Sequence, residues 1–196
     1  MGGRGASSKT KHINTGGGSY DDAKTKYMDP GKLQNEMREK SQTNAMQTFI
    51  DKHANENHEF YAVVNKKGTV MQYNEGGTNS VGARFRDNNN RYFQADKGSM
   101  DIHNHPNGVA LPSTADLMSW ASTKEVTTSL IIGKRTKGMK GNHLTSITKN
   151  KNFNEQKFNS FINMISNKDF VAKEYASLLS ANASKYGYTF SSTYLQ

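Results

Sequence analysis

Two histidines and an aspartate in the stretch DIHNHPNGVALPSTAD, residues 101–116, have the types and spacing that could do chemistry. His103 and His105 are separated by one residue, so in a strand their side chains project from the same face. Asp116 follows Ser113 by three residues, and a serine N-cap would place that aspartate in the first turn of a helix. Two imidazole nitrogens, one carboxylate oxygen and an open fourth position are the donor set of a catalytic zinc site. The sequence therefore predicts a metal site.

A purely structural explanation covers part of the same stretch. Residues 113–116 match the pattern in which a serine N-cap and an acid three residues later bond to each other's backbone, which begins a helix without any metal. His103 and His105 could likewise face solvent from a polar strand. A helix cap does not require paired histidines just upstream, however. The metal site is therefore the favoured interpretation, with Ser113 and Asp116 serving both purposes.

The periodicity of the surrounding segments predicts the elements that must position these residues. Apolar residues recur at helical spacing from Lys32 to about Asn55, and β-branched and aromatic residues at 59–73 indicate a hairpin. The other expected elements are a pair of short strands at 75–93, strands at 99–105, 126–133, 143–148 and 188–195, a helix at 113–124, and one or two helices at 154–184. This order predicts an α/β (α+β) fold with a single mixed β-sheet flanked by helices.

Composition limits the architecture and the compartment. The chain has 196 residues, of which 33% are hydrophobic, which suits one domain with one core. Residues 1–28 are rich in Gly, Ser, Thr and Lys, so we expect a disordered leader there and a single domain over 29–196. The absence of cysteine excludes disulfides and thiol catalysis. No apolar run is long enough for a membrane span and no secretory signal opens the chain, so we expect a cytoplasmic protein without a membrane partner.

The four residues of the predicted site also resemble the zinc motif of a known family. The pattern His103-x-His105, seven residues, Ser113, two residues, Asp116 has the spacing of the JAB/MPN (JAMM) metalloproteases, and HNHPNG looks most like their RadC-like and phage-associated bacterial branch. The resemblance covers about residues 56–150. It implies a cytidine-deaminase-like fold with one Zn²⁺ per chain, held by His103, His105 and Asp116. Ser113 would then hydrogen-bond a bound water or a tetrahedral oxyanion.

The family also has a catalytic glutamate at the start of an earlier strand. Glu59 opens the predicted hairpin and is the position to which the resemblance assigns this base, while Glu56 competes for the role. Such a base would take a proton from the attacking water and deliver it to the leaving nitrogen of an amide. Position 62 is alanine, which excludes a second common zinc-protease pattern, HExxH, beginning at His58.

The resemblance implies a zinc-dependent metallopeptidase or isopeptidase whose protein substrate is a peptide or a ubiquitin-like conjugate. The opening MGGRGASS is similar to small proteins of phages and mobile elements, which suggests a bacterial host cytoplasm. Two alternatives stay open: a RadC-like nucleic-acid-associated protein, and a non-catalytic scaffold with the same fold. The complete set of ligands, together with a candidate base, favours the enzyme.

Positive charge is concentrated in one acid-free stretch of a chain with a net charge of +9. Its basic residues are Lys134, Arg135, Lys137, Lys140, Lys149 and Lys151. They could bind nucleic acid or an acidic protein surface, or they could form an ordinary solvated loop. Three further histidines, His12, His53 and His143, are interpreted as surface residues.

Overall fold

The computed structural model describes residues 12–14, 25–82 and 95–195. Within these residues a mixed sheet of seven strands has the order β2-β4-β3-β5-β6-β7-β9. In that order the strands are Lys26–Tyr27, Val70–Glu75, Phe60–Val64, Ser99–His105, Val126–Gly133, His143–Lys149 and Tyr188–Tyr194. β5 and β6 run parallel, and the other neighbouring pairs are antiparallel. The predicted mixed sheet is confirmed.

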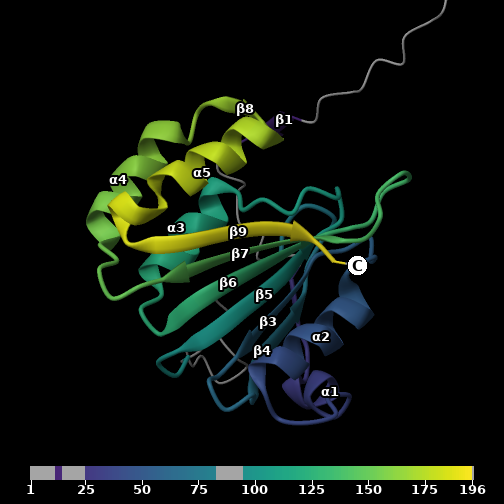
Figure 1. The fold of residues 1–196 in the computed structure, drawn as a ribbon. Coiled ribbons are helices and arrows are strands. Elements are labelled where there is room, and N and C mark those ends of the chain that lie inside the picture. Colours follow the sequence, from purple (N-terminus) through teal and green to yellow (C-terminus); the bar gives the residue numbers. More distant parts are fainter. Residues whose placement is uncertain (1–11, 15–24, 83–94, 196) are drawn as a thin grey trace, which may run out of the picture.

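Helices cover both faces of this sheet (Figure 1). One face carries α1 (Pro30–Gln34) and α2 (Gln42–His53), and the other carries α3 (Thr114–Ser122), α4 (Glu155–Ile165) and α5 (Ala172–Tyr186). Each face has its own core: Phe49 of α2 packs in one apolar cluster with Ile102, and Trp120 of α3 packs in the other with Val63. A strand covered on both faces tends to be apolar along its length, as in β3, where all five residues are buried.

β5 lies in the middle of the sheet and carries the predicted ligands. His103 pairs with Tyr61, which belongs to the core beneath α3, so His103 and His105 face the α3 side. Asn104 alternates with them and faces the α2 side, as Ile102 does. Every residue of β5 is buried, although several are polar. Burial of polar groups is unfavourable unless they form hydrogen bonds or ion pairs, so the stability of β5 depends on the contacts of these side chains.

The predicted helix from Lys32 to Asn55 is wrong in one respect, because the structure divides it in two. The Ser41 side chain accepts a hydrogen bond from the Asn44 N–H at 3.1 Å and begins α2 as its N-cap. The Asn44 side chain in turn accepts from the Arg38 N–H at 2.8 Å, which holds the connecting turn. Apolar spacing alone does not reveal such a break. The predicted region 154–184 contains α4 and α5, with the short strand β8 between them.

Two predictions fall largely outside the described residues. Of the leader 1–28, the structure describes only 12–14 and 25–28: β1 (His12–Asn14) pairs with β8 (Asp169–Val171), and β2 pairs with β4 at the sheet edge. The sheet thus begins ahead of the predicted domain start at residue 29. Most of the strand pair predicted at 75–93 lies in 83–94, which is not described. None of the helices in the described ranges is long and apolar enough to cross a membrane.

His53 is buried, so its prediction as a surface histidine is wrong. It is 3% exposed at the end of α2, its ring stacks on Phe60 with centroids 3.9 Å apart, and its Nε2 lies 2.5 Å from the Tyr73 hydroxyl oxygen. Burial, followed by the charge of Lys52, lowers the pKa of His53 from 6.5 to about 3. The apolar face of α2 continues to its last residue, which the sequence pattern did not reveal.

A histidine that stays neutral when folded makes stability depend on pH. Because the pKa of His53 is lower in the folded chain than in the unfolded chain, the unfolded chain gains the proton first as the pH falls below about 6.5, and stability decreases from there toward pH 3. At pH 5 we expect His53 to lower the free energy of unfolding by about 2 kcal/mol relative to pH 8. Denaturant unfolding of His53→Gln should therefore show a smaller loss.

His58→Gln is the matched control, because the side chain of His58 is 51% exposed. We expect this variant to keep nearly the wild-type dependence of stability on pH. Equal dependence in the wild type and in His53→Gln would contradict the buried, neutral state of His53.

Candidate metal centre

β5 brings the two predicted histidine ligands together. The Nε2 atoms of His103 and His105 are 3.1 Å apart, and the residues are 5% and 9% exposed. Neighbouring strands hold β5 on both sides, so the two imidazoles start from a fixed backbone. Two imidazole nitrogens at this distance stabilise each other only when a proton or a metal cation lies between their lone pairs. The pair is therefore a site for positive charge.

The start of α3 supplies the carboxylate. Ser113 is the N-cap, and its hydroxyl oxygen accepts from the Asp116 N–H at 3.1 Å while Asp116 Oδ2 accepts from the Ser113 N–H at 2.7 Å. The Ser113 hydroxyl also donates to Asp116 Oδ2 at 2.7 Å. The predicted capping box is thus confirmed. In this structure the hydroxyl of Ser113 orients Asp116, whereas the resemblance assigns it to an oxyanion.

The three predicted ligands converge on one point. Asp116 Oδ2 lies 3.7 Å from Nε2 of His103 and 3.7 Å from Nε2 of His105. Ligand atoms that surround a tetrahedral zinc at 2.0–2.1 Å lie about 3.3 Å from one another, a value between the observed spacings. Two imidazole nitrogens and one carboxylate oxygen are also a suitable donor set. The predicted grouping is confirmed, and this cluster could hold a metal ion.

A backbone carbonyl fixes the tautomer of His105. Its Nδ1 lies 2.7 Å from the carbonyl oxygen of Val109, which can only accept, so Nδ1 carries the proton and the Nε2 lone pair faces the cluster. The loop that carries Val109 packs tightly on β6, since a Cβ added to Gly133 would lie 2.7 Å from the Gly108 carbonyl oxygen. Sequence reasoning missed Val109 and Gly133 because this contact joins segments whose proximity only the fold creates.

The electrostatics of the cluster favour a cation. Burial raises the pKa of Asp116, but the charges and hydrogen bonds of His103 and His105 outweigh it and hold that pKa well below its usual range. Burial lowers the pKa of His103, but the neighbouring Asp116 more than compensates and raises it to about 9. In the metal-free chain a proton on His103 is thus the stabilised cation. A metal ion bound by the same atoms would take its place.

Glu59 lies beside the cluster, whereas Glu56 does not. Glu59 immediately precedes β3 and is 9% exposed. Burial raises the pKa of its carboxyl, and the nearby charges of His105 and His103 partly oppose that rise. Glu56 is exposed in the connection after α2. Of the two glutamates that the sequence offered, Glu59 has the surroundings of a functional carboxylate.

Two other buried residues near the cluster were not singled out by the sequence. Asp101 shares the His103 face of β5, and burial raises its pKa to about 6. Tyr175 of α5 is buried, and its pKa is raised by burial and then by the charge of Asp116. In the sequence these are an acid in a strand and an aromatic on a helix face. Only the packing of α5 against the sheet shows that Tyr175 lies near Asp116.

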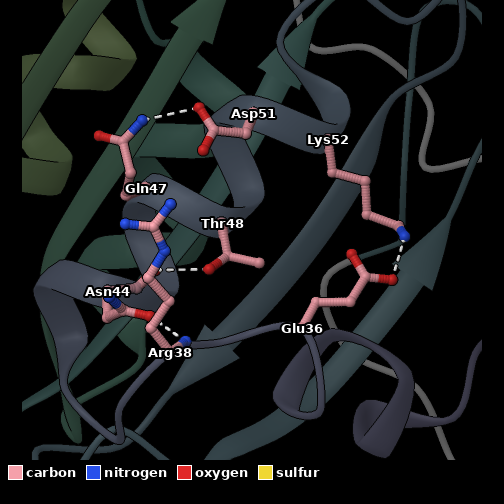
Figure 2. A pocket seen from close by; sticks show the side chains of 7 residues that line it. All are labelled: Glu36, Arg38, Asn44, Gln47, Thr48, Asp51 and Lys52. Carbon is pink, nitrogen blue, oxygen red and sulfur yellow. Dashed lines mark hydrogen bonds and ion pairs between the residues drawn. The ribbon is translucent and has the colours of Figure 1, made fainter.

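A separate polar hollow of about 570 Å³ lies between α2 and the α1–α2 connection. Figure 2 shows that its side chains pair with one another: Lys52 bonds to Glu36, and Gln47 bonds to Asp51 at 2.7 Å. Both pairs are exposed, and the two acidic and two basic side chains that line the hollow balance in charge. The hollow therefore has no convergent set of ligand atoms comparable to the cluster on β5 and α3.

Comparison with known proteins found no relative. No protein-family model, curated protein or solved structure matches this chain. The interpretation of the site therefore rests on the positions and surroundings of its own residues.

Ser113→Ala tests the two roles of Ser113, as the N-cap of α3 and as the residue that orients Asp116. Removal of the cap should lower the free energy of unfolding by about 1 kcal/mol. It should also weaken metal affinity about 10–100-fold, because Asp116 loses the hydroxyl that orients it. Denaturant unfolding and a competition titration with a chromophoric chelator measure the two effects.

Ser41→Ala is the matched control, because Ser41 caps α2 in the same way but far along the chain from the cluster. It should cost similar stability and leave metal affinity unchanged. Equal losses of metal affinity in both variants would mean that Ser113 acts only through global stability.

Proposed function

We propose that this chain is a zinc-dependent metallopeptidase or isopeptidase of the JAB/MPN type. The observation that carries the proposal is the convergence of the buried His103 and His105 with the half-buried Asp116, next to the buried carboxyl of Glu59. Three protein ligands leave a fourth position open, which is typical of catalytic rather than structural zinc sites. Zinc suits the donors, because imidazole and carboxylate are both common ligands of zinc. The motif spacing adds a resemblance in the same direction.

The chemistry divides between the ion and the chain. A bound zinc ion would polarise an amide carbonyl and lower the pKa of a water molecule. Glu59 would accept the proton of the attacking water and deliver it to the leaving nitrogen, and a pKa raised by burial suits that exchange near neutral pH. Ser113 would hold Asp116 in place through its two hydrogen bonds to the carboxylate. The substrate would be a peptide bond or an isopeptide bond of a ubiquitin-like conjugate.

Glu59→Gln should slow hydrolysis strongly while leaving the metal ligands intact. We expect the variant to retain zinc and to lose about 10²–10⁴-fold in rate, the usual contribution of a general base. The assay incubates zinc-loaded protein with a peptide library and with lysine-linked ubiquitin-like dimers, and mass spectrometry detects new termini. Glu56→Gln, a change at an exposed position, should keep wild-type activity. Loss of activity in Glu56→Gln but not in Glu59→Gln would reverse the assignment.

A second candidate function, association with nucleic acid, is favoured by the charge next to the cluster. Lys134, Arg135, Lys137 and Lys140 lie on the connection between β6 and β7. The Lys134 N–H donates to the His105 carbonyl at 3.0 Å, so this connection begins where β5 ends. Lys149 does not join this surface, because its Nζ donates to the carbonyls of Trp120 and Thr123 at the end of α3. We propose that the basic connection binds phosphates or, with the peptidase, acidic parts of a protein substrate.

Removal of two exposed charges tests this second candidate. Lys137→Gln/Lys140→Gln should weaken binding to a labelled DNA duplex and reduce the slope of log affinity against log salt by about two. Lys66→Gln/Lys67→Gln, an equal loss of charge in the exposed β3–β4 turn, should leave that slope unchanged. Fluorescence anisotropy at several salt concentrations measures it. Absence of DNA binding at low salt would contradict this candidate.

A further inference from the structure

Asn104, the residue between the two histidines, makes a pair of contacts that the metal site does not explain. Its side chain is fully buried on the α2 face of β5. The amide oxygen accepts from the Phe60 N–H at 2.6 Å, and the amide nitrogen donates to the His58 carbonyl at 2.9 Å. Both partners flank Glu59 in the chain. Asn104 therefore bonds to the peptide group on each side of the candidate base.

These bonds replace the pairing that the two strands would otherwise make. The β3–β5 ladder ends at Tyr61 and His103, and continuation would pair Phe60 with Asn104 through their backbones. The side-chain amide of Asn104 takes that place.

The other two polar groups of the same peptide units are held by the segment after β4. The Glu59 N–H donates to the Gly77 carbonyl at 2.7 Å, and the Glu59 carbonyl accepts from the Gly76 N–H at 2.8 Å. A side chain at Gly76 would meet the Ser80 carbonyl at 2.2 Å, so this close approach requires glycine. The backbone at Glu59 is thus bonded on both sides, to Asn104 and to the Gly76–Gly77 turn.

Only an amide of this length satisfies both contacts. A backbone N–H needs an acceptor and a backbone carbonyl needs a donor, and the asparagine side chain offers one of each on a single planar group. An aspartate would lose the donor, a leucine would lose both groups, and a serine hydroxyl is too short to span the two. Loss of either bond would leave a buried polar backbone group without its partner.

We propose that Asn104 is a positioning residue that acts through Glu59: it fixes the peptide groups around Glu59 and so holds the carboxylate toward the cluster of His103, His105 and Asp116. The inference deepens the proposed function and rests on it, because it assigns Asn104 to the base of that same site. The two ligands and the positioning residue then come from one short strand segment, with alternate residues serving opposite faces of the sheet.

The two hydrogen bonds of the Asn104 side chain, to the Phe60 N–H and the His58 carbonyl, are called the clamp below. Amide hydrogen exchange of the metal-free chain tests the clamp directly. In Asn104→Ser we expect the Phe60 amide to exchange at least about tenfold faster relative to the Asn65 amide, which bonds to the Thr69 carbonyl at the other end of β3. If the Asn104→Ser variant does not fold, Asn104→Leu, which is similar in size to asparagine but has no polar side-chain group, should show the same faster exchange of the Phe60 amide. Unchanged relative exchange of Phe60 in the folded variants would overturn the clamp.

Asn65→Ser is the matched control for damage to β3. Asn65 also clamps backbone with its side chain, by accepting from the N–H groups of Lys67 and Thr69 at 3.0 and 2.9 Å. It lies at the end of β3 away from Glu59. We expect its loss to destabilise the hairpin without accelerating exchange of Phe60 relative to Tyr61. Faster exchange of Phe60 in this control would reduce Asn104 to a general support of the strand.

Cobalt-loaded protein tests whether the clamp acts through Glu59. Removal of the Glu59 charge in Glu59→Gln should lower the pH midpoint of the visible Co²⁺ spectrum by about one unit. Asn104→Ser should shift the midpoint in the same direction, and the double variant should show no shift beyond that of Glu59→Gln. A wild-type midpoint in Asn104→Ser, or shifts that simply add, would overturn the positioning role.

The two measurements also separate this inference from the proposed function. Failure of the wild type to bind Co²⁺ would refute the metal site and, with it, any role of Asn104 in catalysis, while the exchange result would still decide whether the clamp exists. Binding of Co²⁺ with an intact clamp but no coupling to Glu59 would overturn the inference alone.

Discussion

Hydrogen bonds between Ser113 and Asp116 hold one carboxylate between two converging imidazoles, and the rest of the site depends on that arrangement. The contacts of that carboxylate with His103 and His105, at 3.7 Å each, join the start of α3 to the end of β5, which are separate layers of the fold. Without the carboxylate, the Nε2 atoms of His103 and His105 would lie 3.1 Å apart and would depend on the nearby carboxyl groups of Asp101 and Glu59 for balancing charge. A helix cap thus also completes a cation site, which explains why one short motif carries both signals.

Contacts outside the cluster hold its residues in position. A backbone carbonyl fixes the tautomer of His105, and a close approach at Gly133 holds the loop that supplies this carbonyl. On the opposite face of β5, the amide of Asn104 bonds to the chain on both sides of Glu59. Such outer contacts determine how well ligands and bases keep their geometry. The last three residues of β5 therefore supply two candidate ligands on one face of the sheet and the Asn104 hydrogen bonds on the other.

The sequence predicted those features that depend on local spacing. Alternation in β5 and the capping pattern at Ser113 placed His103, His105 and Asp116 together, because both rules act within a few residues. Features that depend on packing were missed: the burial of His53 against Phe60, the approach of Tyr175 to Asp116, and the inward course of Lys149 to the end of α3. The break before α2 was missed as well, since Ser41 and Asn44 cap it within a continuous apolar pattern.

Metal stoichiometry tests the central claim most directly. Wild-type protein and the double variant His103→Ala/His105→Ala would be purified without added metal, supplied with zinc, freed of unbound ion and measured by elemental mass spectrometry, with circular dichroism to verify folding. The cluster predicts about one zinc per chain in the wild type and none in the variant. Folded wild-type protein that retains no metal after zinc is supplied would contradict the metal site. Ser113 and Asp116 would then be a helix cap beside two buried histidines.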